Sequence, residues 1–262
     1  MKITGSFILL YLMIFPFILS AQGKSKIHIG IEAGSQIFIN EVPAYNFIRG
    51  DIDPYGTGMA AGQLSGYTGN WSAGAKMETY ASNGKFAFGG GLRFTLLTSL
   101  LGKENRYDDN NDFFYLLLRE EGPDTDYLKV KNVSQHTGFI GIPFSVKYIP
   151  YFEDFFGFFL KASTGFHLKI FNHQSADFTN SHMEKYEDNV VNMFEEPGIF
   201  YSEFGLGAGM LFGKPDKINL SLDANVPVFA FGAAMEGLFD STLGVGIQIN
   251  LLIPINTTHE NQ

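Results

Sequence analysis

The sequence predicts an all-β protein, an eight-stranded antiparallel up-and-down transmembrane β-barrel with long extracellular loops and short periplasmic turns. Three observations predict it. Apolar residues alternate with polar residues or glycine along eight separate segments, which is the period of a strand and not of a helix. Each segment is long enough to cross a bilayer, which takes about 9–11 tilted residues. Long and short connections alternate between the segments, as they do in transmembrane barrels.

The chain of 262 residues divides into a leader and one domain. Residues 1–21 carry a positive charge at Lys2, continue as an apolar run and end with the small residues Ser20 and Ala21, which together predict a cleaved secretory signal peptide. Residues 22–262 are then expected to form a single outer-membrane β-barrel domain. We expect its strands at about 26–39, 71–80, 85–98, 136–149, 155–171, 200–212, 217–228 and 241–253.

The clearest strands are the fourth and fifth. In the fourth, Ile140, Ile142 and Phe144 lie on one face, and the other face carries Gly141 and Pro143. The fifth repeats this pattern after a short polar turn over 151–154, so the two form a hairpin. Asn83-Gly84 predicts a tight turn between the second and third strands. The long connections follow the first, third, fifth and seventh strands, and an even strand number puts both ends of the chain on the periplasmic side.

Charged residues share the face opposite the apolar one. Lipid cannot satisfy polar groups, so the apolar face is expected outside and the charged face inside, where both signs can form salt bridges. The predicted lumen network consists of Glu32, Lys76, Glu78, Arg93, Lys147, Lys161, His167, Lys169, Glu203 and Asp223. His28 is also expected to point inward. Abundant inward glycine suits a narrow ring of eight strands with a filled core and no open channel.

Alternation alone does not decide which face points inward. A soluble lipocalin-like barrel or a β-sandwich would place the apolar face inside. The glycine-rich charged face, the strand length and the alternating loop lengths favour the membrane form. Phe113–Leu118 leaves a second choice open. With 127–133 it could add two strands to make ten, extend the wall as a hairpin outside the membrane, or form a short helix. The hairpin fits best, because the chain has no turn between 133 and 138.

Aromatic residues near strand ends suit the two membrane–water interfaces, because their rings are apolar at one end and polar at the other. The predicted interface aromatics are Trp71, Tyr148, Tyr151, Phe155 and Tyr201. Their expected role is anchoring in the bilayer, with ordinary turn packing as the alternative.

Composition excludes several kinds of chemistry. The net charge is −9, which argues against nucleic-acid binding, and the absence of cysteine excludes thiol catalysis. Asp108, Asn110 and Asp112 have the spacing of a calcium loop but lack its glycine and its distal glutamate. Ser134 is near His136, and His173 near Ser175, without the sequence context of a hydrolase nucleophile. We therefore expect no cofactor, no metal site and no catalytic residue.

The hairpin IGIPFSVKYIP…FFGFFLKASTGFHLKI resembles the PorT-like outer-membrane barrel family, within the small outer-membrane barrels of the OmpX and OmpA-membrane-domain type. The resemblance covers about Lys26 to Ile253 and rests on architecture and this one hairpin, not on a catalytic motif. It implies a location in the outer membrane of a Gram-negative cell, with lipid and the barrel assembly machinery as partners.

From these observations we expect a non-catalytic outer-membrane scaffold. Its surface loops would bind an extracellular or secretion-system protein, or it would serve an accessory role in secretion or envelope integrity. Two alternatives remain: a lipid-modifying enzyme with a site at the barrel mouth, and a porin for small solutes.

Overall fold

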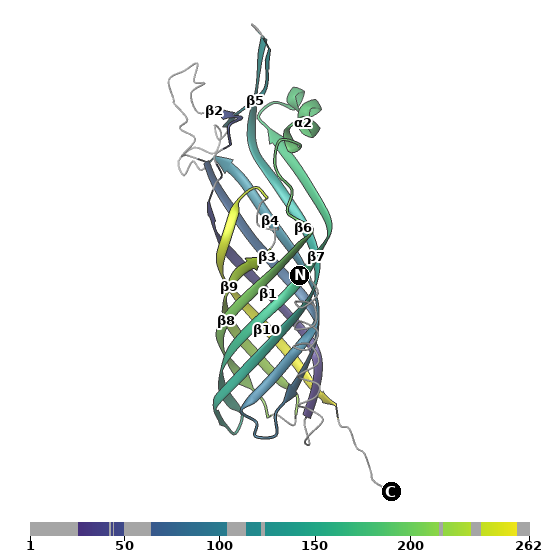
Figure 1. Ribbon diagram of the computed structural model, residues 1–262, viewed down its shortest axis with the longest axis vertical. Coiled ribbons are helices and arrows are strands. Elements are labelled where there is room, and N and C mark those ends of the chain that lie inside the picture. The colour runs from purple at the N-terminus through teal and green to yellow at the C-terminus, as the bar shows by residue number, and fades with distance from the viewer. Residues whose placement is uncertain are drawn as a thin grey trace, which may run out of the picture.

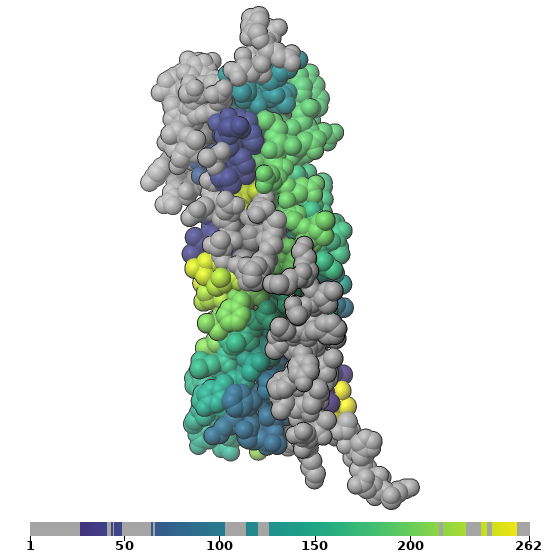
Figure 2. Space-filling model, viewed as in Figure 1, coloured from purple at the N-terminus to yellow at the C-terminus, as the bar shows by residue number. Residues whose placement is uncertain are grey.

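The computed structural model describes residues 26–41, 43, 45–49, 64–103, 114–121, 124–214, 217–231 and 237–255. The expected signal peptide and the Asp108–Asp112 segment lie outside these residues. The described chain is almost entirely antiparallel β-sheet, as predicted, and the molecule is elongated (Figures 1 and 2). No helix in this part of the chain is long and apolar enough to cross a membrane.

Eight strands form a closed ring. They are β1 (Lys26–Glu41), β3 (Leu64–Tyr80), β4 (Phe86–Lys103), β6 (Asp124–Glu153), β7 (Phe156–Phe178), β8 (Phe200–Phe212), β9 (Asn219–Phe231) and β10 (Asp240–Ile255). Each strand pairs antiparallel with the next in this order, and β10 pairs with β1 to close the ring. The strands run obliquely to the long axis, as Figure 1 shows.

Tight turns connect the strands at one end of the ring, drawn at the bottom of Figure 1. Between β3 and β4, the amide of Gly84 donates to the carbonyl of Ala81, and Gly84 has a φ of 67°, which glycine adopts without strain. Between β6 and β7, only Asp154 and Phe155 remain outside the strands. The turn expected over 151–154 is therefore shorter, because residues 151–153 continue the ladder with β7.

The opposite end carries an additional structure, which we call the head. It contains β2 (Ile48–Arg49), β5 (Phe114–Glu121), the 3₁₀ helix η2 (Ser181–Tyr186), α2 (Glu187–Val191) and the far ends of β6 and β7. Strand β5 pairs with β6 and with β2, outside the ring. The expected wall-extending hairpin is thus present. The helical alternative for Phe113–Leu118 is wrong for 114–118, and the ring itself has eight strands.

The head has an apolar core of its own. Its buried side chains come from β2, β4, β5, β6, β7, α2 and two connecting segments: Ile48, Leu101, Phe114, Leu116, Leu128, Val130, Val133, Ala176, Phe178, Val190, Phe194, Leu238 and Phe239. These segments are far apart in the sequence, so the core holds the head together by burying apolar surface.

Several strands are longer than the alternation predicted. Strand β3 starts at Leu64 instead of residue 71, and β6 starts at Asp124 instead of 136. Strand β7 continues to Phe178 instead of ending at 171. The apolar face changes sides along β6: Ile140 points outward, whereas Val133 and Val130 are buried inside. Backbone pairing continues through this change, so the strand continues although its apolar residues no longer stay on one face. The sequence prediction relied on that single face and therefore ended the strand too early.

Candidate functional site in the interior of the ring

The ring has an apolar outer surface and a polar interior. Exposed residues include Ile31, Leu160, Leu206 and Ile247, each more than half exposed. On the inward face, between two apolar layers, the buried residues are polar or charged: His28, Glu32, Lys76, Glu78, Lys147, Lys161, His167, Ser221, Asp223, Gln248 and Asn250. Among the described residues, the buried charged side chains therefore lie in the interior of the ring.

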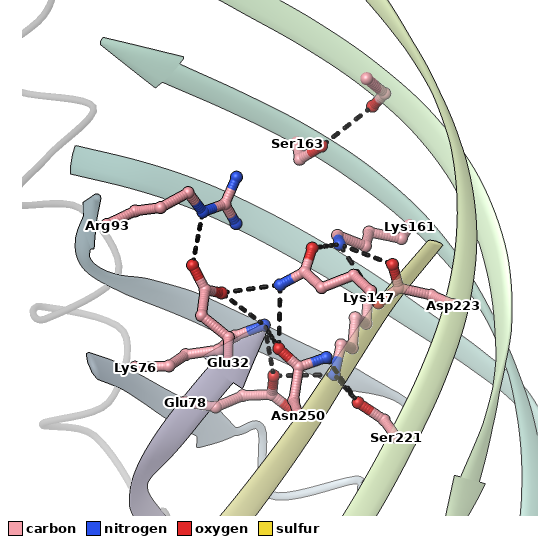
Figure 3. Close-up of polar contacts among 12 residues, drawn as sticks. Glu32, Lys76, Glu78, Arg93, Lys147, Lys161, Ser163, Ser221, Asp223 and Asn250 are labelled. Atoms are coloured by element: carbon pink, nitrogen blue, oxygen red, sulfur yellow. Dashed lines mark hydrogen bonds and ion pairs between the residues drawn. The ribbon is translucent and has the colours of Figure 1, made fainter. Parts of the chain in front are cut away.

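Nine of the ten predicted lumen residues belong to one connected network. Figure 3 shows the part of it around Glu32, Lys76 and Lys161. The nine residues come from every ring strand except β10. Strand β10 contributes Gln248, whose side chain joins the Lys161–Asp223 pair to the rest of the network. Four cations (Lys76, Arg93, Lys147 and Lys161) meet four carboxylates (Glu32, Glu78, Glu203 and Asp223), so the formal charges cancel when His167 is neutral. Pairing of this kind offsets the desolvation of buried charges.

The closest charged contacts come from two glutamates and their cations. Glu32 accepts a hydrogen bond from Nε of Arg93 at 2.5 Å, and Nη1 of Arg93 lies 3.4 Å from Glu203. Glu78 lies 2.8 Å from Nζ of Lys147 and 3.7 Å from Nζ of Lys76. Each glutamate is thus held by a cation from a different strand, because Arg93 is on β4 and Lys147 is on β6.

Uncharged side chains connect these ion pairs, and the sequence prediction did not include them. Gln248 donates to Glu32 at 2.7 Å and accepts from Lys161 at 2.8 Å. Asn250 accepts from Lys76 at 3.0 Å and donates to Ser221 at 3.0 Å. Their strand parity could have identified them, since Ser221 shares the face of Asp223, and Gln248 and Asn250 face the interior from the last strand.

Lys169 lies apart from the network. Its Nζ donates to the carbonyl of Pro197 at 2.7 Å and to Glu196 at 3.0 Å. Lys169 therefore fixes the segment that leads into β8 instead of taking part in the interior charge pairs.

Tyr201 corrects one of the predicted interface positions. Its ring is buried, stacks on His167 with a centroid distance of 4.3 Å and meets Phe139 edge to face. Every second residue of a strand faces the same side, and Tyr201 lies two residues before the inward Glu203, so Tyr201 also faces the interior. A Cβ at Gly141 or Gly165 would overlap the His167 imidazole, so these glycines leave the space in which the ring stacks.

The other predicted interface aromatics lie on the outer surface. Trp71, Tyr148, Tyr151 and Phe155 are all exposed. Tyr148, Tyr151 and Phe155 are at the end with the tight turns. Trp71 lies inside β3 instead of at its start, because the strand begins seven residues earlier.

Two apolar layers bound the charged network. The turn-end layer consists of Tyr80, Ala87, Ile149, Phe159 and Leu211. The head-end layer consists of Phe38, Leu97, Phe139 and Tyr201. Nζ of Lys147 lies 4.7 Å from the centroid of the Phe159 ring, which joins the network to the turn-end layer by a cation–π contact.

The serine and histidine pairs considered for hydrolysis do not form a catalytic arrangement. Ser134 and Ser175 hydrogen-bond to each other at 2.7 Å, and Nδ1 of His136 bonds to Thr98 at 3.2 Å. His173 lies opposite His136 on the neighbouring strand. A hydrolase needs its base within hydrogen-bond reach of the nucleophile, and these serines have each other as partners.

Metal-binding clusters of three or more His, Cys, Asp or Glu side chains are absent from the described part of the chain. A cavity beside the network is lined by residues that include Glu32, Lys76, Arg93, Lys161 and Glu203. Each of these five already bonds to another network member, so the arrangement serves mutual charge pairing.

No protein-family model and no curated protein matches this chain. Among solved structures, a crystal structure of a FadL homologue from Pseudomonas aeruginosa aligns over 88% of this chain and 90% of its own. The identity is 7% and the TM-score 0.19, a likeness too low to support any argument.

Proposed function

We propose that this protein is a transmembrane β-barrel of the Gram-negative outer membrane that acts as a non-catalytic scaffold. In this proposal the ring spans the bilayer, the tight turns face the periplasm and the head stands outside the cell. The head and its loops bind an extracellular or secretion-system protein, and the barrel assembly machinery inserts the ring.

The observation that carries the proposal is that the apolar face of the ring points outward and its charged face points inward. A soluble barrel hides its apolar residues and exposes its charges, whereas this ring exposes apolar residues all around and buries a charged network. Such a surface is stable in lipid and prone to aggregation in water. The shortest ring strands, β8 and β9, have 13 residues each, more than the about 9–11 that a bilayer requires.

The filled interior disfavours a porin. Two apolar layers and a connected network of salt bridges and hydrogen bonds lie across the path between the ends of the ring. Near the head, the side chain of Gln135 donates to the carbonyl of Glu195 and accepts from the amide of Leu238, so it ties two connecting segments across the mouth.

The scaffold role has support from the head. A hairpin that extends the wall and a separate apolar core give a firm projection beyond the apolar surface of the ring. A different hairpin, formed by 140–150 and 155–170 in the ring, resembles PorT-like proteins, and this resemblance favours an accessory role in secretion or envelope integrity. A lipid-modifying enzyme is disfavoured because the serines near the mouth pair with one another.

The first experiment is electrophoretic mobility of the protein, with and without boiling, after separation of the two membranes. We expect a heat-modifiable band in the outer-membrane fraction. Soluble protein without a mobility shift would refute the membrane barrel.

A second experiment separates the scaffold from the alternatives. We expect no conductance steps when the purified protein is added to a planar bilayer, and no lipid hydrolysis. Conductance steps would identify a pore. Hydrolysis that Ser134→Ala or His136→Ala removes would identify an enzyme.

A further inference from the structure

The outer wall carries a histidine pair that the interior network does not use. His136 in β6 and His173 in β7 are directly opposite each other in the antiparallel ladder. Both lie on the outward face, beyond Ile140 and Phe171, the last exposed apolar residues of the ring on these strands, and His173 is exposed. Side chains opposite each other in such a ladder have Cβ atoms about 4.5–5.5 Å apart, close enough for two imidazoles to reach one ion.

The surroundings of His136 suit a ligand role. Its Nδ1 is 3.2 Å from Oγ1 of Thr98, which lies opposite it on β4. When Nδ1–H donates to this oxygen, Nε2 carries the free lone pair. Metal-binding histidines commonly hold their second nitrogen in this way, which fixes the tautomer and the ring plane.

The outward positions next to the pair on β6 and β7 carry no charged side chain. On the head side, Ser134 and Ser175 bond to each other. On the other side, Gly138 lies opposite Phe171. Within the described chain no third acidic or histidine side chain completes a cluster, so water would fill the remaining coordination positions.

We propose that His136 and His173 form a two-histidine site for a borderline transition-metal ion, of which Zn²⁺ is the probe. Imidazole suits zinc, nickel and copper, whereas calcium and magnesium prefer oxygen ligands. The site lies on the outer wall between the apolar surface of the ring and the head, so a bound ion would link β6 and β7 where they leave the ring.

The test is zinc binding by untagged, folded protein in detergent, measured by competition with a chromophoric chelator. The chain has six histidines, of which His28 and His167 are buried. The matched control is therefore the double variant H182N/H259N, which keeps the pair and removes the remaining two. We expect the control to bind zinc as the wild type does.

We expect H136N and H173N each to weaken zinc binding at least tenfold, and H136N/H173N to bind one zinc ion fewer than the wild type. The heat-modifiable band should be unchanged in all variants. With Cu²⁺ in place of zinc, electron paramagnetic resonance should show two coupled nitrogens in the control. Equal zinc binding by H136N/H173N and wild type, or loss of binding in H182N/H259N alone, would overturn the proposal.

Discussion

The ring and the head bury opposite kinds of side chain. In the ring, Glu32 and Lys147 are buried while Ile31 and Val146 are exposed. In the head, Leu116 and Val130 are buried among other apolar side chains. The same strand, β6, takes part in both regions and reverses its apolar face between them. The difference supports the proposal that lipid surrounds the ring and water surrounds the head.

The comparison is tested most strongly by removing one charge from the ring interior. Asp223 is the carboxylate partner of Lys161, at 3.0 Å, and both are buried. Asp223→Leu leaves the ammonium group without a counter-charge and should lower the free energy of unfolding by about 3–5 kcal/mol. Denaturant unfolding in micelles, followed by fluorescence of Trp71, the single tryptophan, measures this effect.

The control is the double variant D223L/K161M. It removes both charges, so it should recover most of the stability that D223L loses. A double variant as unstable as D223L would mean that the lost stability comes from packing and not from the unpaired charge.

The head should respond to a change in volume instead. Leu116 is fully buried in the head core, and Leu116→Ala should destabilise the head by about 2–5 kcal/mol through the cavity that it leaves. Faster proteolysis of the head measures this effect, while the heat-modifiable band of the ring should remain. Loss of that band would show that the ring and the head unfold as one unit.

The outer surface of the ring gives the next largest effect. Ile249 is exposed on β10, midway along the strand. Ile249→Lys should cost about 2–4 kcal/mol if lipid surrounds this position. Ile199→Lys, at an exposed position before β8, is the matched control and should cost about 1 kcal/mol or less. Equal stability of I249K and wild type in lipid vesicles would refute a lipid-facing outer surface.

The smallest expected effect concerns the open edge of β7. Strand β7 continues beyond its pairing with β8, and there the amide of Ala176 donates to the carboxylate of Glu187 in α2 at 3.2 Å. Glu187→Ala should lower stability by about 0.5–1.5 kcal/mol and speed hydrogen exchange at Ala176. Unchanged exchange at that amide would mean that α2 does not protect the edge.

Much of the ring interior could be predicted because a strand places every second residue on one face. This rule alone groups Glu32 with His28, and Lys76 with Glu78. It also places Tyr201 inside with Glu203, although the position of Tyr201 near a strand end suggested an interface role. The head could not be predicted in the same way, because its buried residues come from short segments whose patterns differ.

The sequence by itself determined the class of structure and the residues that share a face, because alternation with period two is a local property of the backbone. The tertiary structure decided which face is inside, which partners meet and where the faces reverse. Lys161 bonds to Asp223 and Gln248, and His136 lies opposite His173, only through the register between strands and the closure of the ring. Register depends on pairing between distant segments, and no local pattern in the chain specifies it.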